Sequence, residues 1–231
     1  MDRIAGPIVP FESRGGSMST TTGPIIEVFA DIWCPFAHVG LRAIEAQRAR
    51  TGRSDVAIWV RAWPLERVNG APLDPAVTWE HADDLRTKVA PDLFRHLEVD
   101  RFPSSTLDAL AVANRAYRMD LRVGERVSFA LRDALFEQGR DISDRVTLEC
   151  VAHDLGVVMP DESDRADVEA DWQEGRTRGV LGSPHFFCGD TDVFCPSLDV
   201  TKDPIEGVSI VRDVSRLTQF LERCFSRPGL A

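Results

Sequence analysis

The chain has 231 residues, of which 43% are hydrophobic, and this is enough to build one or two domains around a buried core. Asp and Glu outnumber Lys and Arg by 37 to 27, so the formal net charge is -10. The basic residues stand singly, without a cluster that would bind phosphates, and the sequence therefore predicts no nucleic-acid partner. No apolar run approaches the roughly 20 residues that cross a bilayer, so it also predicts no membrane partner.

Residues 1–23 are expected to form a disordered leader. Pro7, Pro10 and Glu12 interrupt any signal-peptide hydrophobic region, and Gly15–Gly23 is rich in Gly, Ser and Thr. Without an export signal, the chain is predicted to be cytoplasmic, where its five cysteines would mostly be reduced.

A strand, a helix and a second strand are predicted to open the folded part of the chain. Residues 25–31 have the β-branched and aromatic character of a buried strand. Pro35 favours the first position of a helix, which we expect to run to about Arg50 and to end at Gly52. Residues 56–63 are typical of a second strand. This order implies a parallel pair of strands joined by a right-handed crossover.

Helices without strands are predicted from Trp79 to about Arg178, because apolar residues recur there at intervals of three and four. Strand character returns at residues 185–188 and 193–195, which are predicted to form a hairpin. Residues 199–207 are expected to form a loop, and apolar spacing from Val211 to Phe225 predicts an amphipathic helix.

The predicted fold class is therefore α/β, with an inserted all-helical domain. The expected first domain combines residues 24–77 and 179–231. The expected inserted domain comprises residues 78–178.

Cys34 is the residue whose side chain is best placed for a chemical role. A cysteine at the start of a helix has its sulfur near unpaired amides and the positive end of the helix dipole, which favour the thiolate. We therefore expect a lowered pKa for this thiol. A second cysteine three residues later would complete a Cys-x-x-Cys redox pair, but Ala37 occupies that position.

Three neighbours of Cys34 are candidates for supporting roles. His38 lies one helical turn later, where a protonated imidazole would lower the thiol pKa further and pass a proton to a leaving thiolate. An equally weighted alternative is a packed histidine that makes one ordinary hydrogen bond. Trp33 and Phe36 flank the thiol and would form an apolar rim for a substrate, although aromatic residues at the end of a strand are as often core.

The order of the elements, together with Cys34-Pro35-Phe36-Ala37 and residues 179–184, resembles a thioredoxin fold with inserted helices. This is the pattern of the DsbA-like family, in particular the branch similar to FrnE-type oxidoreductases and 2-hydroxychromene-2-carboxylate isomerases. The resemblance covers roughly residues 25–225. Further matches are Asp31, Gly40, Trp63-Pro64-Leu65, residues 135–139 and residues 141–143.

The resemblance implies that the Ser183–Pro184 peptide bond is cis and lies beside Cys34. The Ser183 backbone would then face Cys34 and pair with an extended peptide or with a thiol tripeptide. The catalytic residues expected from this are Cys34 and His38, and the substrate-binding residues are Trp33, Pro35, Phe36, Ser183 and Pro184.

The departure at Ala37 changes the chemistry that the resemblance implies. In a dithiol enzyme the second cysteine resolves the mixed disulfide, and Ala37 cannot do so. Cys34 would act as a monothiol that waits for an external thiol such as glutathione or mycothiol. No tightly bound cofactor and no metal are expected. The isomerase and kappa-class transferase relatives have serine at the Cys34 position, so the match to them is weaker.

The other four cysteines allow several interpretations. Cys188 and Cys195 flank the hairpin turn, and they would be within disulfide reach if the strand register placed them opposite each other. Two buried thiols are favoured over this disulfide. A metal site formed with His185 lacks a fourth ligand. Cys150 and Cys224 are expected in the core.

Three functions follow from these observations. The leading one is a thiol–disulfide oxidoreductase that acts through Cys34 on a small-molecule thiol or a disulfide-containing substrate. The second is a thiol-dependent isomerase or transferase of small aromatic substrates. The third is a non-catalytic binding protein with the same fold. The sequence leaves open whether the protein is a homodimer.

Overall fold

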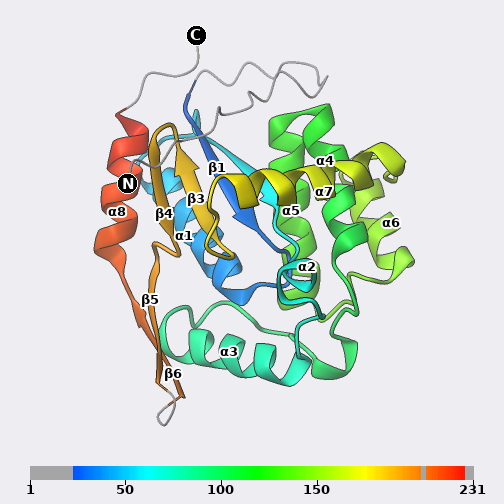
Figure 1. Ribbon diagram of the computed structural model, residues 1–231, viewed down its shortest axis with the longest axis horizontal. Coiled ribbons are helices and arrows are strands. Elements are labelled where there is room, and N and C mark those ends of the chain that lie inside the picture. Colours follow the sequence, from blue (N-terminus) through cyan, green and yellow to red (C-terminus); the bar gives the residue numbers. More distant parts are fainter. Residues whose placement is uncertain (1–22, 204–206, 227–231) are drawn as a thin grey trace.

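Strand β1 (Ile25–Ala30) lies inside a mixed four-stranded sheet of order β2-β1-β3-β4. The structure is a computed structural model that describes residues 23–203 and 207–226, so residues 1–22 of the expected leader lie outside it. Strand β2 (Ala57–Ala62) is parallel to β1, whereas β3 (His185–Cys188) is antiparallel to β1. Strand β4 (Thr191–Phe194) pairs with β3 to form a hairpin at the other edge. Figure 1 shows this sheet between helices.

The two faces of the sheet are covered by different helices. Helices α1 (Pro35–Arg50) and α8 (Val214–Phe225) pack on the face that carries Val28 and Phe186. Helix α7 (Glu162–Thr177) packs on the opposite face, where Phe29 contacts Trp63 and Phe187 edge to face. Because side chains alternate along a strand, the two faces bury two separate apolar clusters. The sheet is therefore the middle layer of three.

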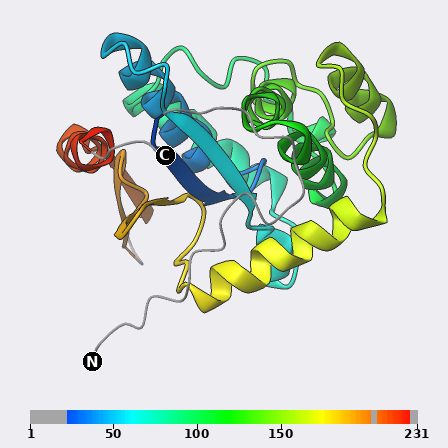
Figure 2. The same ribbon diagram turned by 90° about the horizontal axis from the view of Figure 1, so that it is seen from above.

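The helices between β2 and β3 form a second body of packed helices beside the sheet. Besides α7, it contains α3 (Pro75–Lys88), α4 (Leu107–Met119), α5 (Leu121–Phe136) and α6 (Arg145–Asp154). Their apolar faces share one core cluster, which reaches Ile32, Trp33 and Ala62 of the sheet domain. Figure 2 shows α4 to α6 on one side of the strands and α8 on the other. The insertion thus lies against β2, next to the segment that leads to Cys34.

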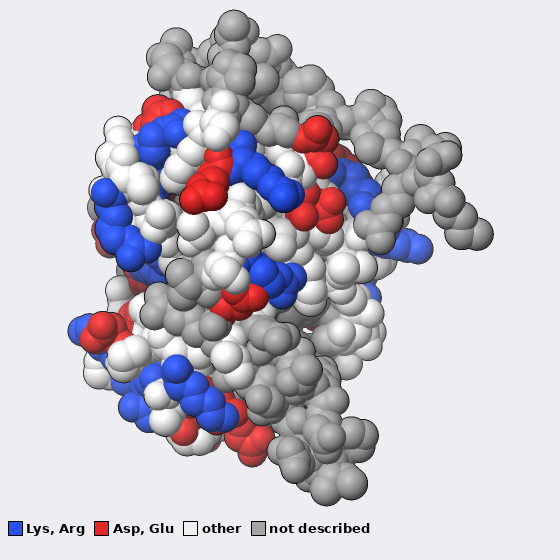
Figure 3. Space-filling view, turned by 90° about the vertical axis from the view of Figure 1, so that its left-hand side faces the viewer, with Lys and Arg blue, Asp and Glu red and all other residues white. Residues whose placement is uncertain are grey.

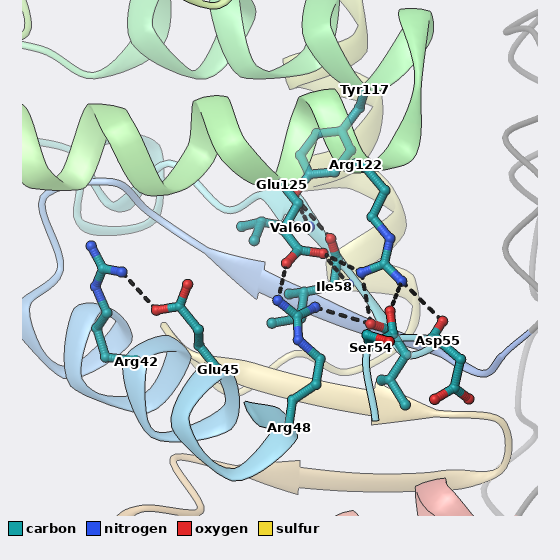
Figure 4. Close-up of polar contacts among 11 residues, drawn as sticks. Arg42, Glu45, Arg48, Ser54, Asp55, Ile58, Val60, Tyr117, Arg122 and Glu125 are labelled. Carbon is teal, nitrogen blue, oxygen red and sulfur yellow. Dashed lines mark hydrogen bonds and ion pairs between the residues drawn. The ribbon is translucent and has the colours of Figure 1, made fainter. Parts of the chain in front are cut away.

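The insertion also closes the open edge of β2 (Figure 4). Three amides of β2 face away from β1, and each donates a hydrogen bond to a side chain of the insertion. Ile58 donates to Glu125 (3.0 Å), Val60 to the Tyr117 hydroxyl (3.0 Å) and Ala62 to Asp171 (3.1 Å). The same hydroxyl donates to the Ile58 carbonyl (3.2 Å). An unpaired strand edge otherwise recruits other strands. These side chains replace a neighbouring strand and fix the insertion to the sheet.

Two expectations for local structure were wrong. The segment expected to be a loop at residues 199–207 contains most of β5 (Leu198–Asp203) and the start of β6 (Gly207–Arg212), which pair as an antiparallel ribbon. Val211 belongs to β6 and not to the last helix. The loop after β2 contains the short helix α2 (Leu65–Asn69). Both ribbon strands mix polar and apolar residues, and neither contains the continuous apolar run that marked β1 and β2.

The surface has mixed charge on the side that carries α8. Basic and acidic side chains are interspersed there (Figure 3). In the described residues, every helix is too short or too polar to cross a membrane.

Candidate active site

Cys34 is the N-cap residue of α1, with Pro35 in the first turn of the helix. Its side chain is buried, and its Sγ atom donates a hydrogen bond to the Ser183 carbonyl oxygen at 3.1 Å. The peptide bond between Ser183 and Pro184 is cis. Ser183 itself is half-buried, and its hydroxyl accepts a hydrogen bond from the Asp31 amide (3.0 Å). The structure therefore brings together Cys34, Pro35, Ser183 and Pro184.

The expected lowering of the Cys34 pKa was wrong. Burial raises the pKa of this thiol above its ordinary value of 9.0, because a thiolate loses its hydration in an apolar site. The Ser183 hydroxyl and the amides of Ala37 and Phe36 lower the pKa, as a helix N-terminus should, but they offset burial only in part. The charge on Asp31 raises it further. Cys34 is therefore a thiol, and not a thiolate, at neutral pH.

The rate at which Cys34 is alkylated should rise with pH through pH 9. Below its pKa the thiolate fraction increases about tenfold per pH unit, and the thiolate is the reacting form. The measurement is alkylation by iodoacetamide at pH 7–9, followed on the Cys34 peptide by mass spectrometry. The exposed Cys150 is replaced by serine in all samples, since it would otherwise consume reagent. A rate that stops rising below pH 8 would contradict this account.

His38 is directed toward the insertion. Its fully buried ring lies 5.0 Å from the Phe136 ring centre and 5.4 Å from that of Phe94, and Nε2 is 2.9 Å from the Glu137 carboxylate. Burial lowers the pKa of His38, and Glu137 offsets this only in part. The expected protonated imidazole is thus not the favoured form. Its contact with Cys34 is made by the backbone, whose amide donates to the Cys34 carbonyl (3.1 Å).

The two aromatic neighbours of Cys34 differ in exposure. Trp33 is fully buried and stacks on Phe102, with ring centres 5.7 Å apart, because it belongs to the core cluster of the insertion. It therefore does not form the expected rim. Phe36 is half-buried and lies 5.4 Å from the His81 ring, so it remains available at the surface near the thiol.

Asp31 is a buried carboxyl next to the site. It accepts hydrogen bonds from the amides of Ile32 (2.7 Å) and Leu65 (2.5 Å). Burial raises its pKa to about 6, although these amides, Thr106 and Arg132 lower it. Asp31 was one of the residues that matched the DsbA-like family, but its role could not be predicted. The structure shows that it connects the end of β1 to the start of α2 and adds negative charge near Cys34.

Arg132 is a second buried charge that sequence reasoning missed. Its guanidinium is fully buried and donates to the Asp31 carbonyl (3.1 Å), to the Ser128 carbonyl (2.8 Å) and to the Ser128 hydroxyl (2.7 Å). Burial lowers its pKa to about 10, while Tyr117, Asp31 and Cys34, each in its ionised form, act in the opposite direction. Nothing in the helical pattern distinguished this arginine from exposed ones, so only the fold reveals it.

Cys188 and Cys195 are both buried free thiols, which confirms the favoured interpretation of the hairpin cysteines. The register pairs Cys188 with Thr191, and Cys195 follows the end of β4, so the two cysteines are not opposite each other. Cys188 instead forms a thiol hydrogen bond with Cys224 of α8. Cys150 is exposed, which corrects its expected place in the core, whereas Cys224 is buried.

A groove of about 340 Å³ runs along the outer side of α1, and Val39, Leu93 and Leu217 are among its lining residues. Neither Cys34 nor Ser183 lines it. The groove is therefore separate from the site at Cys34.

This architecture defines a thioredoxin-fold protein with helices inserted after the second strand and a single cysteine at the first turn of α1. The family model of the DSBA-like thioredoxin domain matches residues 25–206, and the chain belongs to that family. The predicted thioredoxin-like fold and DsbA-like family are thus confirmed. No curated protein matches the chain.

Solved structures share this fold at low identity. A probable DsbA oxidoreductase from Streptomyces coelicolor is 22% identical, with 90% of this chain and 93% of that chain covered and a TM-score of 0.58. A 2-hydroxychromene-2-carboxylate isomerase is 15% identical, with 74% and 88% covered and a TM-score of 0.57. The cytosolic disulfide reductase DsbM from Pseudomonas aeruginosa, solved with GSH, is 12% identical, with 86% and 98% covered and a TM-score of 0.54. At these identities the similarity shows the fold alone.

Proposed function

We propose that this protein is a thiol–disulfide oxidoreductase in which Cys34 attacks a disulfide. A new bond joins the Cys34 sulfur to one substrate sulfur, and the substrate S–S bond breaks. The departing sulfur leaves as a thiolate and takes up the proton that Cys34 has lost. The observation that carries this proposal is the thiol of Cys34 at the N-terminus of α1, 3.1 Å from the Ser183 carbonyl.

The substrate would reach the thiol past half-buried groups. Phe36, two residues after Cys34, and Ser183, whose carbonyl oxygen accepts the Cys34 hydrogen bond, are both partly exposed. Trp33, Pro35 and Pro184 are buried. Phe36 would supply apolar contact, and the Ser183 backbone would pair with the substrate. His38 would act as a positioning residue, because its bond to Glu137 holds the first turn of α1 against the insertion.

Release of the mixed disulfide needs a thiol other than residue 37, since Ala37 has none. We propose that a low-molecular-weight thiol, glutathione or mycothiol, serves as the external reductant, and that the substrate is a small thiol or a disulfide-containing molecule. The cytoplasm is the proposed location, because such thiols keep cysteines reduced there.

Reaction with an aromatic disulfide probe that releases a coloured thiolate tests this function. In a Cys150→Ser background, the Cys34-containing protein should release the thiolate at a rate that rises with pH, and the further Cys34→Ser variant should lose this phase. Circular dichroism of both proteins confirms folding. Equal rates for the two proteins would refute the proposal.

The protonated state of Cys34 favours a second candidate function. A buried S–H group can donate a hydrogen bond to the thiolate of a bound cofactor, as the serine of isomerase relatives would. A thiol-dependent isomerase or transferase would then bind glutathione in both the wild type and Cys34→Ser. Calorimetric titration with reduced glutathione distinguishes the two candidates, because saturable binding to Cys34→Ser belongs to the second alone.

A further inference from the structure

Cys195 contacts the same short segment that holds the Cys34 thiol. Its amide donates to the Pro184 carbonyl oxygen at 3.0 Å, and the Cys34 Sγ donates to the Ser183 carbonyl oxygen at 3.1 Å. These two carbonyls belong to consecutive residues. The two cysteines are 161 positions apart in the sequence, and each donates a hydrogen bond to one of two consecutive residues, Ser183 and Pro184.

The side chain of Cys195 is buried beside this segment. It is 7% exposed and belongs to the core cluster that contains Ile32 and Trp33, whereas Cys34 itself packs in the cluster of α1 and α8. Burial first, and then the charge that the Cys34 sulfur carries when it is ionised, raise the pKa of Cys195 to about 12.

The backbone conformation at Cys195 breaks the alternation of side chains that β4 would otherwise continue. Its φ angle of 45° lies in the left-handed region, which residues other than Gly, Asn and Asp seldom adopt. Val193, two residues earlier, packs on the α1 and α8 cluster, whereas Cys195 packs in the cluster of the insertion. Regular alternation would place both on one face. Such conformations persist where surrounding structure fixes them, and they are common at functional sites.

We infer that Cys195 is the resolving cysteine of this protein and replaces the thiol that Ala37 lacks. The inference rests on the proposed attack by Cys34 and names the thiol that completes it. The external reductant then acts on an internal Cys34–Cys195 disulfide.

The resolving step balances without a further oxidant. The Cys195 sulfur attacks the Cys34 sulfur of the mixed disulfide, a Cys34–Cys195 bond forms, and the bond to the substrate sulfur breaks. The substrate sulfur leaves with the electron pair and takes up the proton from Cys195. The substrate disulfide is reduced to two thiols, and the two cysteines supply the two electrons.

Oxidised glutathione is the probe that tests this step. Wild type, Cys195→Ser, Cys34→Ser and the control Cys188→Ser are exposed to it, quenched by acid and examined by intact-mass and non-reducing peptide mapping. Cys188 is the matched control, because it is buried in the same hairpin but its thiol forms a hydrogen bond with the Cys224 thiol. We expect a Cys34–Cys195 cross-linked peptide in wild type and Cys188→Ser. In Cys195→Ser, the glutathione adduct on Cys34 should persist about tenfold longer or more.

The outcomes separate this inference from the proposed function. A Cys34 adduct of equal lifetime in wild type and Cys195→Ser, without a cross-linked peptide, overturns the inference and leaves the attack by Cys34 intact. No adduct on Cys34 in either protein refutes the proposed function, and the inference with it. The cross-linked peptide in wild type is decisive even if Cys195→Ser fails to fold.

Discussion

Replacing Arg61 with methionine should lower the free energy of unfolding by about 3–5 kcal/mol, the typical cost of removing one partner from a buried ion pair. Arg61 is fully buried on β2 and lies 2.8 Å from both Glu27 and Asp171, with Glu174 as a third partner. Burial lowers its pKa, but the three carboxylates outweigh burial and raise it. Methionine would leave Glu27 and Asp171 buried with less positive charge beside them.

Urea denaturation of Arg61→Met at pH 7 measures this cost. Arg145→Met is the matched control, since Arg145 is 80% exposed and pairs only with Glu149 among the described residues, so its loss should cost well under 1 kcal/mol. Equal midpoints for the two variants would show that the cluster contributes no stability.

The Gly124→Ala substitution should destabilise the protein by about 2–3 kcal/mol, as overpacking does, although alanine favours helices. A Cβ atom at position 124 would lie 2.1 Å from the Tyr117 ring. The ring cannot easily move, because its hydroxyl bonds to Val60 and Ile58 on the edge of β2 (Figure 4). The expected effect therefore includes loss of the contact between the insertion and the sheet.

A double-mutant cycle tests this explanation. In a Tyr117→Ala background, Gly124→Ala should be neutral or stabilising by up to about 1 kcal/mol, because the clash is gone and helix propensity remains. Thermal unfolding of the four proteins gives the coupling. If Gly124→Ala costs the same in both backgrounds, the Tyr117 ring is not the reason.

Much of the fold could be predicted from the sequence. The apolar runs around Val28 and Ile58 predicted β1 and β2, and Pro35 and Gly52 predicted the limits of α1. These signals are local, since strand character and helix termini depend on adjacent residues. The β5–β6 ribbon carries no such signal, and its pairing was missed.

The site could be predicted only in part. Cys34, Ser183 and Pro184 are brought together as the resemblance implied, and their positions follow from motifs. The pKa of Cys34 could not be predicted, because the sequence shows the helix N-terminus but not the burial that outweighs it. Arg132 and Cys195 reach the site through tertiary packing of segments distant in sequence, which no local pattern records.

Because the Cys34 thiol is buried and has a raised pKa, its reaction rate at neutral pH should be low. Most thiols of this kind are inert until a substrate or a local opening exposes them. The half-buried Phe36 and Ser183 mark where such an opening would begin. We therefore expect Cys34 to react more slowly than an exposed thiol such as Cys150 at neutral pH.

The central claim is that Cys34 performs thiol–disulfide exchange, and one measurement tests it most directly. Wild type and Cys34→Ser, both carrying Cys150→Ser, are exposed briefly to oxidised glutathione at pH 7, 8 and 9, and their intact masses are compared. We predict a Cys34-dependent product, either a glutathione adduct or an internal disulfide, that forms faster at each higher pH. The same mass increase in both proteins, relative to each untreated protein and at every pH, would contradict the claim.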